Sequence, residues 1–207
     1  MRILGLDEAG RGPVLGPLVV GATMLEFEQL PQLETIGPAD SKLLTRPQRQ
    51  ALFDRITASF TTRTVAVEPQ SLEENLTQVE LNCLAALINE LAPDHVFLDA
   101  PVPPAAIPAF VLQLRSRLVK ACSIVAENKA ESRYPAVAAA SIVAKVTRDR
   151  AMSTLHEQYG DIGWGYPAEP KTLAFLHRCL SQGAFPPCVR TRWATVQRLK
   201  QRSLFGQ

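Results

Sequence analysis

The sequence lacks long apolar runs, closely spaced cysteines and any serine-hydrolase motif. Its longest apolar stretches, such as residues 136–140, fall far short of the ~18–20 residues that cross a bilayer, so we expect no membrane span. No serine stands in a G-x-S-x-G context, and the three histidines have neither catalytic nor metal-ligand spacing. The cysteines form no C-x-x-C pair, which excludes a zinc knuckle and is typical of free thiols in a reducing compartment (Cys83, Cys122, Cys179 and Cys188).

Acidic residues are also missing from the C-terminal part of the chain. No Asp or Glu follows Glu169, whereas seven Lys or Arg do, so residues 170–207 carry a formal charge of +7 and the first 169 residues carry −5. A basic segment attracts phosphates and an acidic body holds cations, as expected of a nucleic-acid enzyme. A solvated basic helix without a partner explains the charges equally well.

The length and composition indicate a single globular domain. With 207 residues, of which 46% are hydrophobic, the chain can bury a full core. Met1 and Arg2 lead directly into an apolar, strand-like segment without the apolar region of a signal peptide, so we expect a cytoplasmic protein. A monomer is the default expectation for its oligomeric state.

Hydrophobic periodicity predicts an α/β protein with mixed strand pairing and a helical C-terminal end. Capping boxes at Thr45 and Ser71 predict helix starts, Pro135 suits the first turn of a long helix, and Gly183 suits a helix end. The small side chains of residues 136–141 allow close approach to a neighbouring element. We expect strands over residues 2–6, 18–24, 62–67, 95–98 and 123–126, and helices over 45–60, between 71 and 93, a short segment ending near 118, 135–159, 170–182 and 190–202.

Four carboxylates are candidates for metal binding. Asp7 and Glu8 follow an apolar strand beside a glycine-rich turn, Asp99 ends another apolar strand, and Glu131 precedes the small-residue helix. Clustered carboxylates without nearby histidine or thiolate suit Mg²⁺ or Mn²⁺. Two such ions ~3.5–4 Å apart can activate a water and stabilise the leaving oxygen of a phosphodiester. Taken singly, each acid is more simply a surface residue.

Several other residues are candidates for substrate binding, each with a plainer alternative. The glycines of Gly10-Arg11-Gly12 let the backbone approach a sugar hydroxyl or phosphate, but a tight turn needs them equally. Lys42 and Arg46, near a helix start, can bind phosphate or belong to an ordinary loop. Ser141, Lys145 and Arg148 lie on one helical face, although the two basic residues can instead pair with Asp149 or solvent. The last candidate is Tyr166, which can stack on a sugar or base or simply pack.

Together these segments resemble the type 2 ribonucleases H, and in particular ribonuclease HII. The matching stretches follow the order of that family from residue 5 to residue 167. They are G-L-D-E-A-G-R-G-P at 5–13, D-S-K at 40–42, F-L-D at 97–99, A-E-N-K-A-E-S-R-Y-P at 126–135, A-A-A-S-I-V-A-K-V-T-R-D-R at 138–150 and Y-G-D-I-G-W-G-Y-P at 159–167.

The resemblance implies a ribonuclease H-like fold, with a mixed five-stranded central sheet flanked by helices and a C-terminal helical extension. It divides the chain into a catalytic core over 1–160 and a basic helical extension over 161–207 within the same structural domain. It also implies an endonuclease that cuts the RNA strand of RNA–DNA hybrids and nicks duplex DNA 5′ of single ribonucleotides, leaving 3′-hydroxyl and 5′-phosphate ends.

The resemblance also assigns roles to residues. It places the metal-binding acids at Asp7, Glu8, Asp99 and Glu131, and the turn that senses the ribose 2′-hydroxyl at Gly10, Arg11 and Gly12. Its stacking tyrosine falls on Tyr166. Phosphate contacts or their supports fall on Lys42, Arg46, Ser141, Lys145 and Arg148.

One position departs from the family pattern. The fourth acid is usually aspartate in ribonuclease HII, and Glu131 is longer by one methylene, which can shift metal preference or geometry. The related ribonuclease HIII has glutamate there, but this chain starts at the first strand without the N-terminal substrate-binding domain usual in ribonuclease HIII. We therefore expect ribonuclease HII.

The C-terminal residues 201–207 resemble the short peptide that docks into bacterial sliding clamps, with Leu204 and Phe205 as apolar anchors. A frayed C-terminus is the alternative. For the whole chain, the competing hypotheses are another two-metal nuclease, such as a ribonuclease HIII-like or junction-resolving enzyme, and a hybrid-binding module without catalysis.

Overall fold

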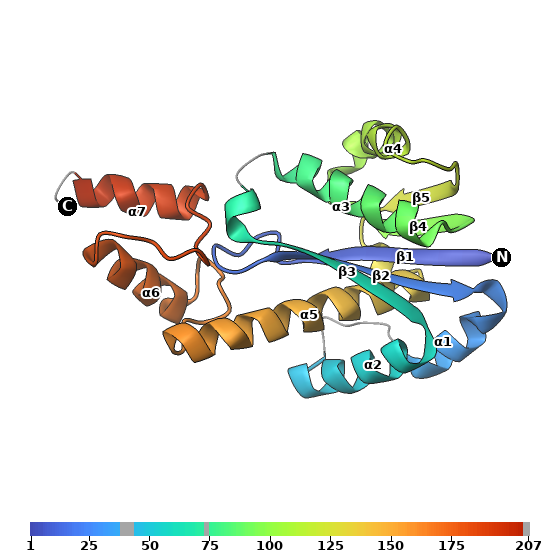
Figure 1. Ribbon diagram of the computed structural model, residues 1–207, viewed down its shortest axis with the longest axis horizontal. Coiled ribbons are helices and arrows are strands. Elements are labelled where there is room, and N and C mark those ends of the chain that lie inside the picture. Colours follow the sequence, from blue (N-terminus) through green and yellow to red (C-terminus); the bar gives the residue numbers. More distant parts are fainter. Residues whose placement is uncertain (38–43, 73–74, 205–207) are drawn as a thin grey trace. The chain divides into compact units, whose positions relative to one another are not determined.

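The computed structural model describes residues 1–37, 44–72 and 75–204. A five-stranded mixed sheet has the order β3-β2-β1-β4-β5 (Figure 1). β1 pairs antiparallel with β2 and parallel with β4, and β4 pairs parallel with β5. The strands are β1 (Arg2–Ala9), β2 (Leu18–Glu26), β3 (Thr61–Val67), β4 (His95–Asp99) and β5 (Ser123–Glu127). The predicted five strands and their mixed pairing are confirmed.

The helices also follow the predicted order, with one additional helix, α1, and with later starts for α3 and α7. They are α1 (Leu30–Ile36), α2 (Arg46–Ser59), α3 (Leu76–Leu91), α4 (Ile107–Arg115), α5 (Pro135–Tyr159), α6 (Pro170–Ser181) and α7 (Ala194–Leu204). The short helix α1 was not predicted. α7 begins at Ala194 rather than residue 190, because residues 188–190 pair with residues 14–16 instead.

Local sequence signals predicted the start of one helix correctly and the start of another wrongly. The capping box at Thr45 is confirmed, since Gln48 N donates to Thr45 Oγ1 at 3.4 Å and Thr45 N donates to Gln48 Oε1 at 2.9 Å. The second predicted box was wrong about the start of α3, because Ser71 lies in a 3₁₀ turn (Pro69–Leu72) and α3 begins at Leu76. Residues 73–74 of that box lie outside the described residues.

The chain forms two compact units, each built from separate segments. The first contains residues 1–9, 19–65 and 76–147, and the second contains residues 10–18, 66–75 and 148–207. The division of the chain at residue 160 remains a prediction about where the helical extension begins.

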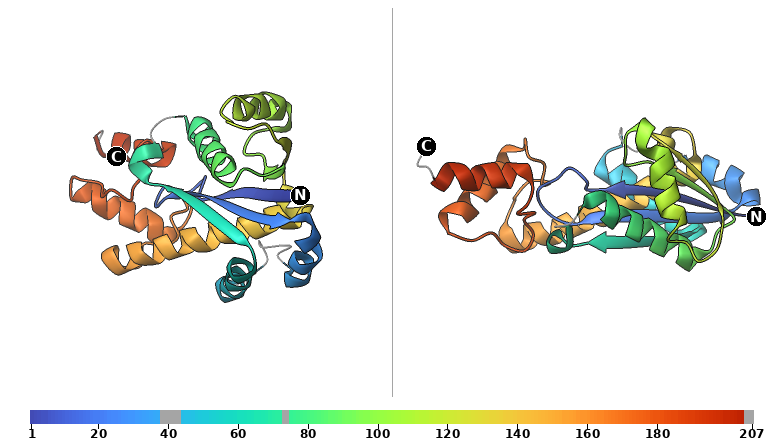
Figure 2. Two further views of the ribbon diagram at one scale, coloured as in Figure 1. Left: turned by 45° about the vertical axis from the view of Figure 1, so that its right-hand side comes forward. Right: turned by 90° about the horizontal axis from the view of Figure 1, so that it is seen from above.

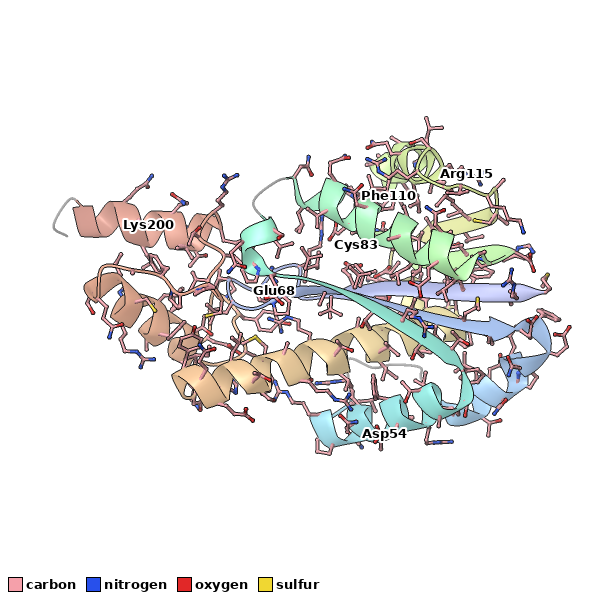
Figure 3. All side chains as sticks on the ribbon, viewed as in Figure 1. Asp54, Glu68, Cys83, Phe110, Arg115 and Lys200 are labelled. Carbon is pink, nitrogen blue, oxygen red and sulfur yellow. The ribbon has the colours of Figure 1, made fainter. Side chains whose placement is uncertain are left out.

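In the first unit, helices cover both faces of the sheet. α3 and α4 pack together on one face, where Cys83 and Phe110 are buried (Figures 2 and 3). α1, α2 and the first part of α5 cover the other face. The predicted close approach of the small-residue segment is confirmed, because a Cβ on Gly5 of β1 would lie 2.1 Å from the Ala136 carbonyl of α5. Only glycine at this position lets α5 lie this close to β1.

The second unit has an apolar core of its own. Val14 and Leu15 pack there against residues from the end of α5, from α6 and from α7, including Met152, Phe175 and Val196. This packing fixes the backbone of the glycine-rich segment that follows β1. Among the described residues, none of the helices is both long enough and apolar enough to cross a bilayer.

Candidate active site

Two of the predicted metal-binding acids lie at the ends of neighbouring parallel strands. β1 and β4 pair in a register that places Leu6 opposite Leu98, so Asp7 and Asp99 occupy the next equivalent positions. The carboxyl ends of parallel strands are where α/β proteins usually place ligands. The predicted strand end at residue 6 was wrong, because β1 continues through Asp7 and Glu8 to Ala9 while pairing with β2.

Asp7 is a buried carboxyl group whose ionisation is unfavourable. Only 6% of the residue is exposed. Burial, together with the negative charge of Asp99, raises the pKa of Asp7 to about 6, although Ser141 and Lys145 act in the opposite direction. A buried carboxylate beside a second negative charge is stabilised by a nearby cation, so the environment of Asp7 fits a divalent metal ion.

A hydrogen-bonded pair on α5 supports Asp7. The Nζ atom of Lys145 donates to Ser141 Oγ at 2.7 Å, and Ser141 hydrogen-bonds to the Asp7 side chain. Ser141 is fully buried. The predicted shared helical face of Ser141 and Lys145 is therefore observed, and its geometry favours support of Asp7 over direct contact with a phosphate.

Asp99 connects β4 to the turn that contains Glu131. The backbone N–H of Ala130 donates to Asp99 Oδ1 at 3.1 Å. Glu131 follows in a short 3₁₀ turn (Ala130–Ser132) and is buried. Lys129, just before this turn, has a left-handed backbone with φ 61°. The structure therefore brings Asp99 and the Glu131 turn together.

Glu8 lies next to Asp7 and is partly exposed, and its backbone N–H donates to Asp7 Oδ1 at 2.7 Å. Within the described ranges, no three His, Cys, Asp or Glu side chains are gathered closely enough to hold a metal ion. Asp7 and Asp99 are thus the adjacent pair, whereas Glu8 follows Asp7 on β1 and Glu131 lies in the turn whose Ala130 amide bonds Asp99.

The glycine turn (Gly10–Gly12) belongs to the second unit, where Arg148 and Pro17 pack closely against Gly10. Gly10 has a left-handed backbone with φ 91°, and a Cβ there would lie 2.5 Å from Arg148 Nε and 2.6 Å from the Pro17 carbonyl oxygen. A Cβ on Gly12 would meet no atom within 4 Å. Gly10 is therefore required by the fold, whereas at Gly12 the backbone faces open space that a ligand can enter.

Tyr166 projects from a second turn in the same unit and is 50% exposed. Glu169 and Thr172 hold this turn by its backbone. The Glu169 carboxylate accepts from Trp164 N at 2.6 Å and from Tyr166 N at 3.3 Å, and Thr172 Oγ1 accepts from Gly165 N at 3.2 Å. Three consecutive amides are thus bound, which fixes the direction in which Tyr166 leaves the turn.

The segment that follows the glycine turn is bonded to the turn that presents Tyr166. Val14 N donates to the Gly165 carbonyl at 2.7 Å. Arg148 is buried, and its Nη2 donates to the carbonyls of Leu15 and Trp164, both at 3.1 Å. Arg148 thus binds the backbone of both segments, whereas the phosphate contact or support that the resemblance assigns to it stays a prediction.

The remaining predicted site residues are less informative. Arg46 is exposed at the start of α2, and Lys42 lies outside the described residues. The sequence reasoning missed Glu169, Thr172 and Arg190. Arg190 was counted only for its charge, and no local pattern distinguishes the buried arginine from its exposed neighbours.

The sheet order and the acids at the ends of β1 and β4 define an α/β protein of the ribonuclease H-like class. Comparison with known proteins then identifies the family. The sequence profile described as "Ribonuclease HII" matches residues 4–196. A ribonuclease HII from Thermococcus kodakarensis is 40% identical over 209 residues, covering 98% of this chain and 91% of that protein. The chain belongs to the ribonuclease HII family.

Solved structures agree with this assignment. The crystal structure of ribonuclease H2 from Pyrococcus horikoshii matches with a TM-score of 0.90 at 35% identity, covering 98% of each chain. A chain in the structure of the PCNA:RNase HII complex from Archaeoglobus fulgidus matches with a TM-score of 0.85 at 35% identity, covering 93% of this chain and 95% of that one. The predicted fold is confirmed.

Family membership also confirms the predicted activity. As a member of this family, the protein is an endoribonuclease that cleaves RNA in RNA–DNA hybrids and at ribonucleotides embedded in DNA. Family membership therefore excludes the three competing hypotheses, which were a non-catalytic binding module, a junction-resolving enzyme and a ribonuclease HIII-like enzyme.

Proposed function

We propose that Asp7, Glu8, Asp99 and Glu131 hold two divalent cations, Mg²⁺ or Mn²⁺, at the scissile phosphate. The observation that supports this proposal is the burial of the Asp7 carboxylate beside Asp99. The candidate ligands are all carboxylates, the donor type that these hard cations prefer. When bound, the cations supply activation of a water molecule and stabilisation of the leaving oxygen.

The other predicted site residues have distinct tasks. Lys145 and Ser141 fix the Asp7 carboxylate, so its oxygens keep one orientation as its charge is neutralised. The Ala130 amide does the same for Asp99. The glycine turn presents backbone to the ribose 2′-hydroxyl, which distinguishes RNA from DNA. Tyr166 stacks on the sugar at the RNA-to-DNA step.

The proposal includes cleavage on the 5′ side of a ribonucleotide, leaving 3′-hydroxyl and 5′-phosphate ends, as the family resemblance implies. The test is a duplex DNA that contains one ribonucleotide, incubated with Mg²⁺, with Mn²⁺ and with EDTA. Denaturing gels give the position of the nick, and extension of the product by a DNA polymerase reports a 3′-hydroxyl. Cleavage in EDTA, or a nick on the 3′ side, would contradict the proposal.

Two variants separate the acid site from the rest of the molecule. Asp7→Asn keeps the side-chain volume but removes the charge, so both turnover and heat of metal binding in calorimetry should be lost. Asp54→Asn changes an acid on the exposed side of α2 and should leave both unchanged (Figure 3). Normal turnover in Asp7→Asn would remove Asp7 from the metal site.

Basic residues supply affinity for the phosphate backbone. Arg46 on α2, Lys42 and the basic C-terminal segment are the contributors we propose, whereas Ser141, Lys145 and Arg148 act as supports. Because phosphate contacts release counterions, log Kd should rise linearly with log salt concentration. The test is to measure the Kd for an RNA–DNA hybrid at several salt concentrations between roughly 50 and 300 mM and to plot log Kd against log salt concentration.

We also propose that residues 201–205 bind a sliding clamp. The relative from Archaeoglobus fulgidus was solved as a complex with PCNA. Here Gln201 is exposed near the end of α7, and Phe205 lies outside the described residues. Surface plasmon resonance of the full chain on immobilised PCNA and on a bacterial clamp tests the proposal. Phe205→Ala should abolish binding, and Phe27→Ala, at an exposed phenylalanine elsewhere, should not.

Two further expectations belong to this proposal. The protein is placed in the cytoplasm, in agreement with its four free cysteines. It is also proposed to act as a monomer. Light scattering on the purified chain measures its mass directly, and a dimer mass would contradict this expectation.

A further inference from the structure

Two buried arginines lie against the glycine-rich segment in the second unit. Arg148 on α5 is 4% exposed, and Arg190, in the segment between α6 and α7, is 1% exposed. Arginine is rarely buried this completely, because its charge loses the solvation of water. Their position therefore needs a reason beyond core packing.

Arg190 holds the segment that follows the glycine turn at both of its ends. Its Nε donates to the Gly16 carbonyl at 2.9 Å, and its Nη1 donates to the Arg11 carbonyl at 3.4 Å. Its backbone N–H donates to the Val14 carbonyl at 2.9 Å, beside the β-bridge between Leu15 and Val189. Three carbonyls between residues 11 and 16 thus end on one residue.

Arg148 connects this segment to the turn that presents Tyr166. Its Nη2 is shared by the carbonyls of Leu15 and Trp164. Its guanidinium carbon lies 6.0 Å from the centre of the Tyr166 ring, and its Nε lies directly under Gly10. A single planar group therefore contacts both of the turns that the proposed function assigns to substrate selection.

Burial makes the charged form of both arginines less favourable. Burial lowers the pKa of both guanidinium groups, and proximity to Arg148 lowers that of Arg190 further, to about 9. In the described part of the chain, the hydrogen bonds of both side chains end on backbone carbonyls, and Arg148 Nε and Arg190 Nη2 have no hydrogen-bond partner. Two like charges under one turn add positive potential where a polyanionic substrate would approach.

We propose that Arg148 and Arg190 are positioning residues for substrate selection. Arg190 fixes the glycine turn, and Arg148 couples that turn to Tyr166, so that the 2′-hydroxyl sensor and the stacking ring act as one unit. This inference rests on the proposed roles of the glycine turn and Tyr166. It predicts stronger energetic coupling of Tyr166 to Arg148, which bonds the Tyr166 turn directly, than to Arg190.

The test is a pair of double-mutant cycles on the full-length chain. kcat and KM are measured on duplex DNA with one embedded ribonucleotide for Arg148→Met, Arg190→Met, Tyr166→Ala and the two double variants. Met fills much of the arginine volume but donates no hydrogen bond. Each single variant should lower kcat/KM by roughly 10-fold or more, since misplacement of about 1 Å has effects of this size.

The two cycles should differ. For Arg148→Met and Tyr166→Ala, the fold-loss of kcat/KM in the double variant should be well below the product of the two single losses, because both substitutions disable the same unit. Losses for Arg190→Met and Tyr166→Ala should come closer to multiplying, because Arg190 bonds carbonyls of the glycine segment and reaches Tyr166 through Arg148. If the Arg148 and Tyr166 losses multiply, the coupling does not exist and the inference is wrong.

Two control variants exclude a general loss of structure. Arg150→Met alters an exposed arginine two residues along α5 and should match the wild type. Arg148→Lys keeps a cation and should recover part of the activity; if Arg148→Met does not fold, this variant replaces it in the cycle. If wild-type protein with Mg²⁺ or Mn²⁺ cleaves the substrate normally although Tyr166→Ala has no effect, the proposed role of Tyr166 fails first, and the inference fails with it.

Discussion

Asp7 and Asp99 occupy equivalent positions on β1 and β4, one residue beyond the paired Leu6 and Leu98, and the charge of Asp99 raises the pKa of buried Asp7. Two carboxylates at adjacent strand ends repel each other until a cation or a proton neutralises them. Much of the pH and metal dependence that we expect of this protein follows from this pair.

Titration of Asp7 should make the free energy of unfolding depend on pH. Its pKa in the folded chain is about 6 and its ordinary value is 3.8, so the folded state binds more protons between these values. The free energy of unfolding should therefore fall as pH rises from 4 to 6, by up to about 3 kcal/mol, and then level off. Urea unfolding in EDTA measures it. Asp7→Asn should lack this decline, and Asp54→Asn should keep it.

Metal ions should stabilise the folded chain in the same region. A cation that neutralises Asp7 and Asp99 binds the folded state alone, so Mg²⁺ or Mn²⁺ should raise Tm at pH 7 by roughly 5–10 °C at about 100 times its Kd. The shift should shrink at pH 5, where protons compete for Asp7. A shift of the same size in Asp7→Asn would place the bound ion elsewhere.

Substitution of Gly10 should damage the protein more than substitution of a comparable glycine. Gly10→Ala combines a left-handed backbone with a clash against Arg148 and Pro17, so we expect a loss of about 2–4 kcal/mol of stability and severe loss of cleavage. Gly183→Ala is the matched control, because Gly183 has φ 80° but a Cβ there meets nothing within 4 Å. Similar melting temperatures for the two variants would contradict the contact argument.

Tyr166→Ala should slow cleavage at a single ribonucleotide more than cleavage of a long RNA–DNA hybrid. Only the first substrate requires selection of one RNA-to-DNA step, and an exposed ring can stack on the sugar there. The ratio of kcat/KM on the two substrates is the measurement. Equal losses on both would refute the role of Tyr166 at the junction.

Glu169→Gln should produce a weaker version of the same defect. The carboxylate holds the amides of Trp164 and Tyr166, and such charge-assisted bonds contribute about 1.5–3 kcal/mol, of which the neutral amide retains a part. We expect a partial fall in the substrate ratio and a lower Tm. Glu157→Gln, at an exposed position of α5, serves as the control and should change neither.

Local sequence signals were sufficient for much of the fold. Strand-forming runs, the capping box at Thr45 and the small residues after Pro135 act through neighbouring residues, so they predict elements without knowledge of the rest. α1 was missed because its seven residues are too few for a helical period to emerge. The helix expected from residue 190 starts late, because pairing between residues 189 and 15 competes with helix formation.

The sequence by itself determined which chemistry is available: carboxylates near strand ends, a glycine turn and a tyrosine in a second turn, all in family order. Only the tertiary structure decided which of them meet. The register of β1 with β4 makes Asp7 and Asp99 neighbours, although they are far apart in the chain. Burial of Arg148 and Arg190 is likewise invisible in the sequence, because an arginine that binds carbonyls from distant segments has the same local pattern as one in solvent.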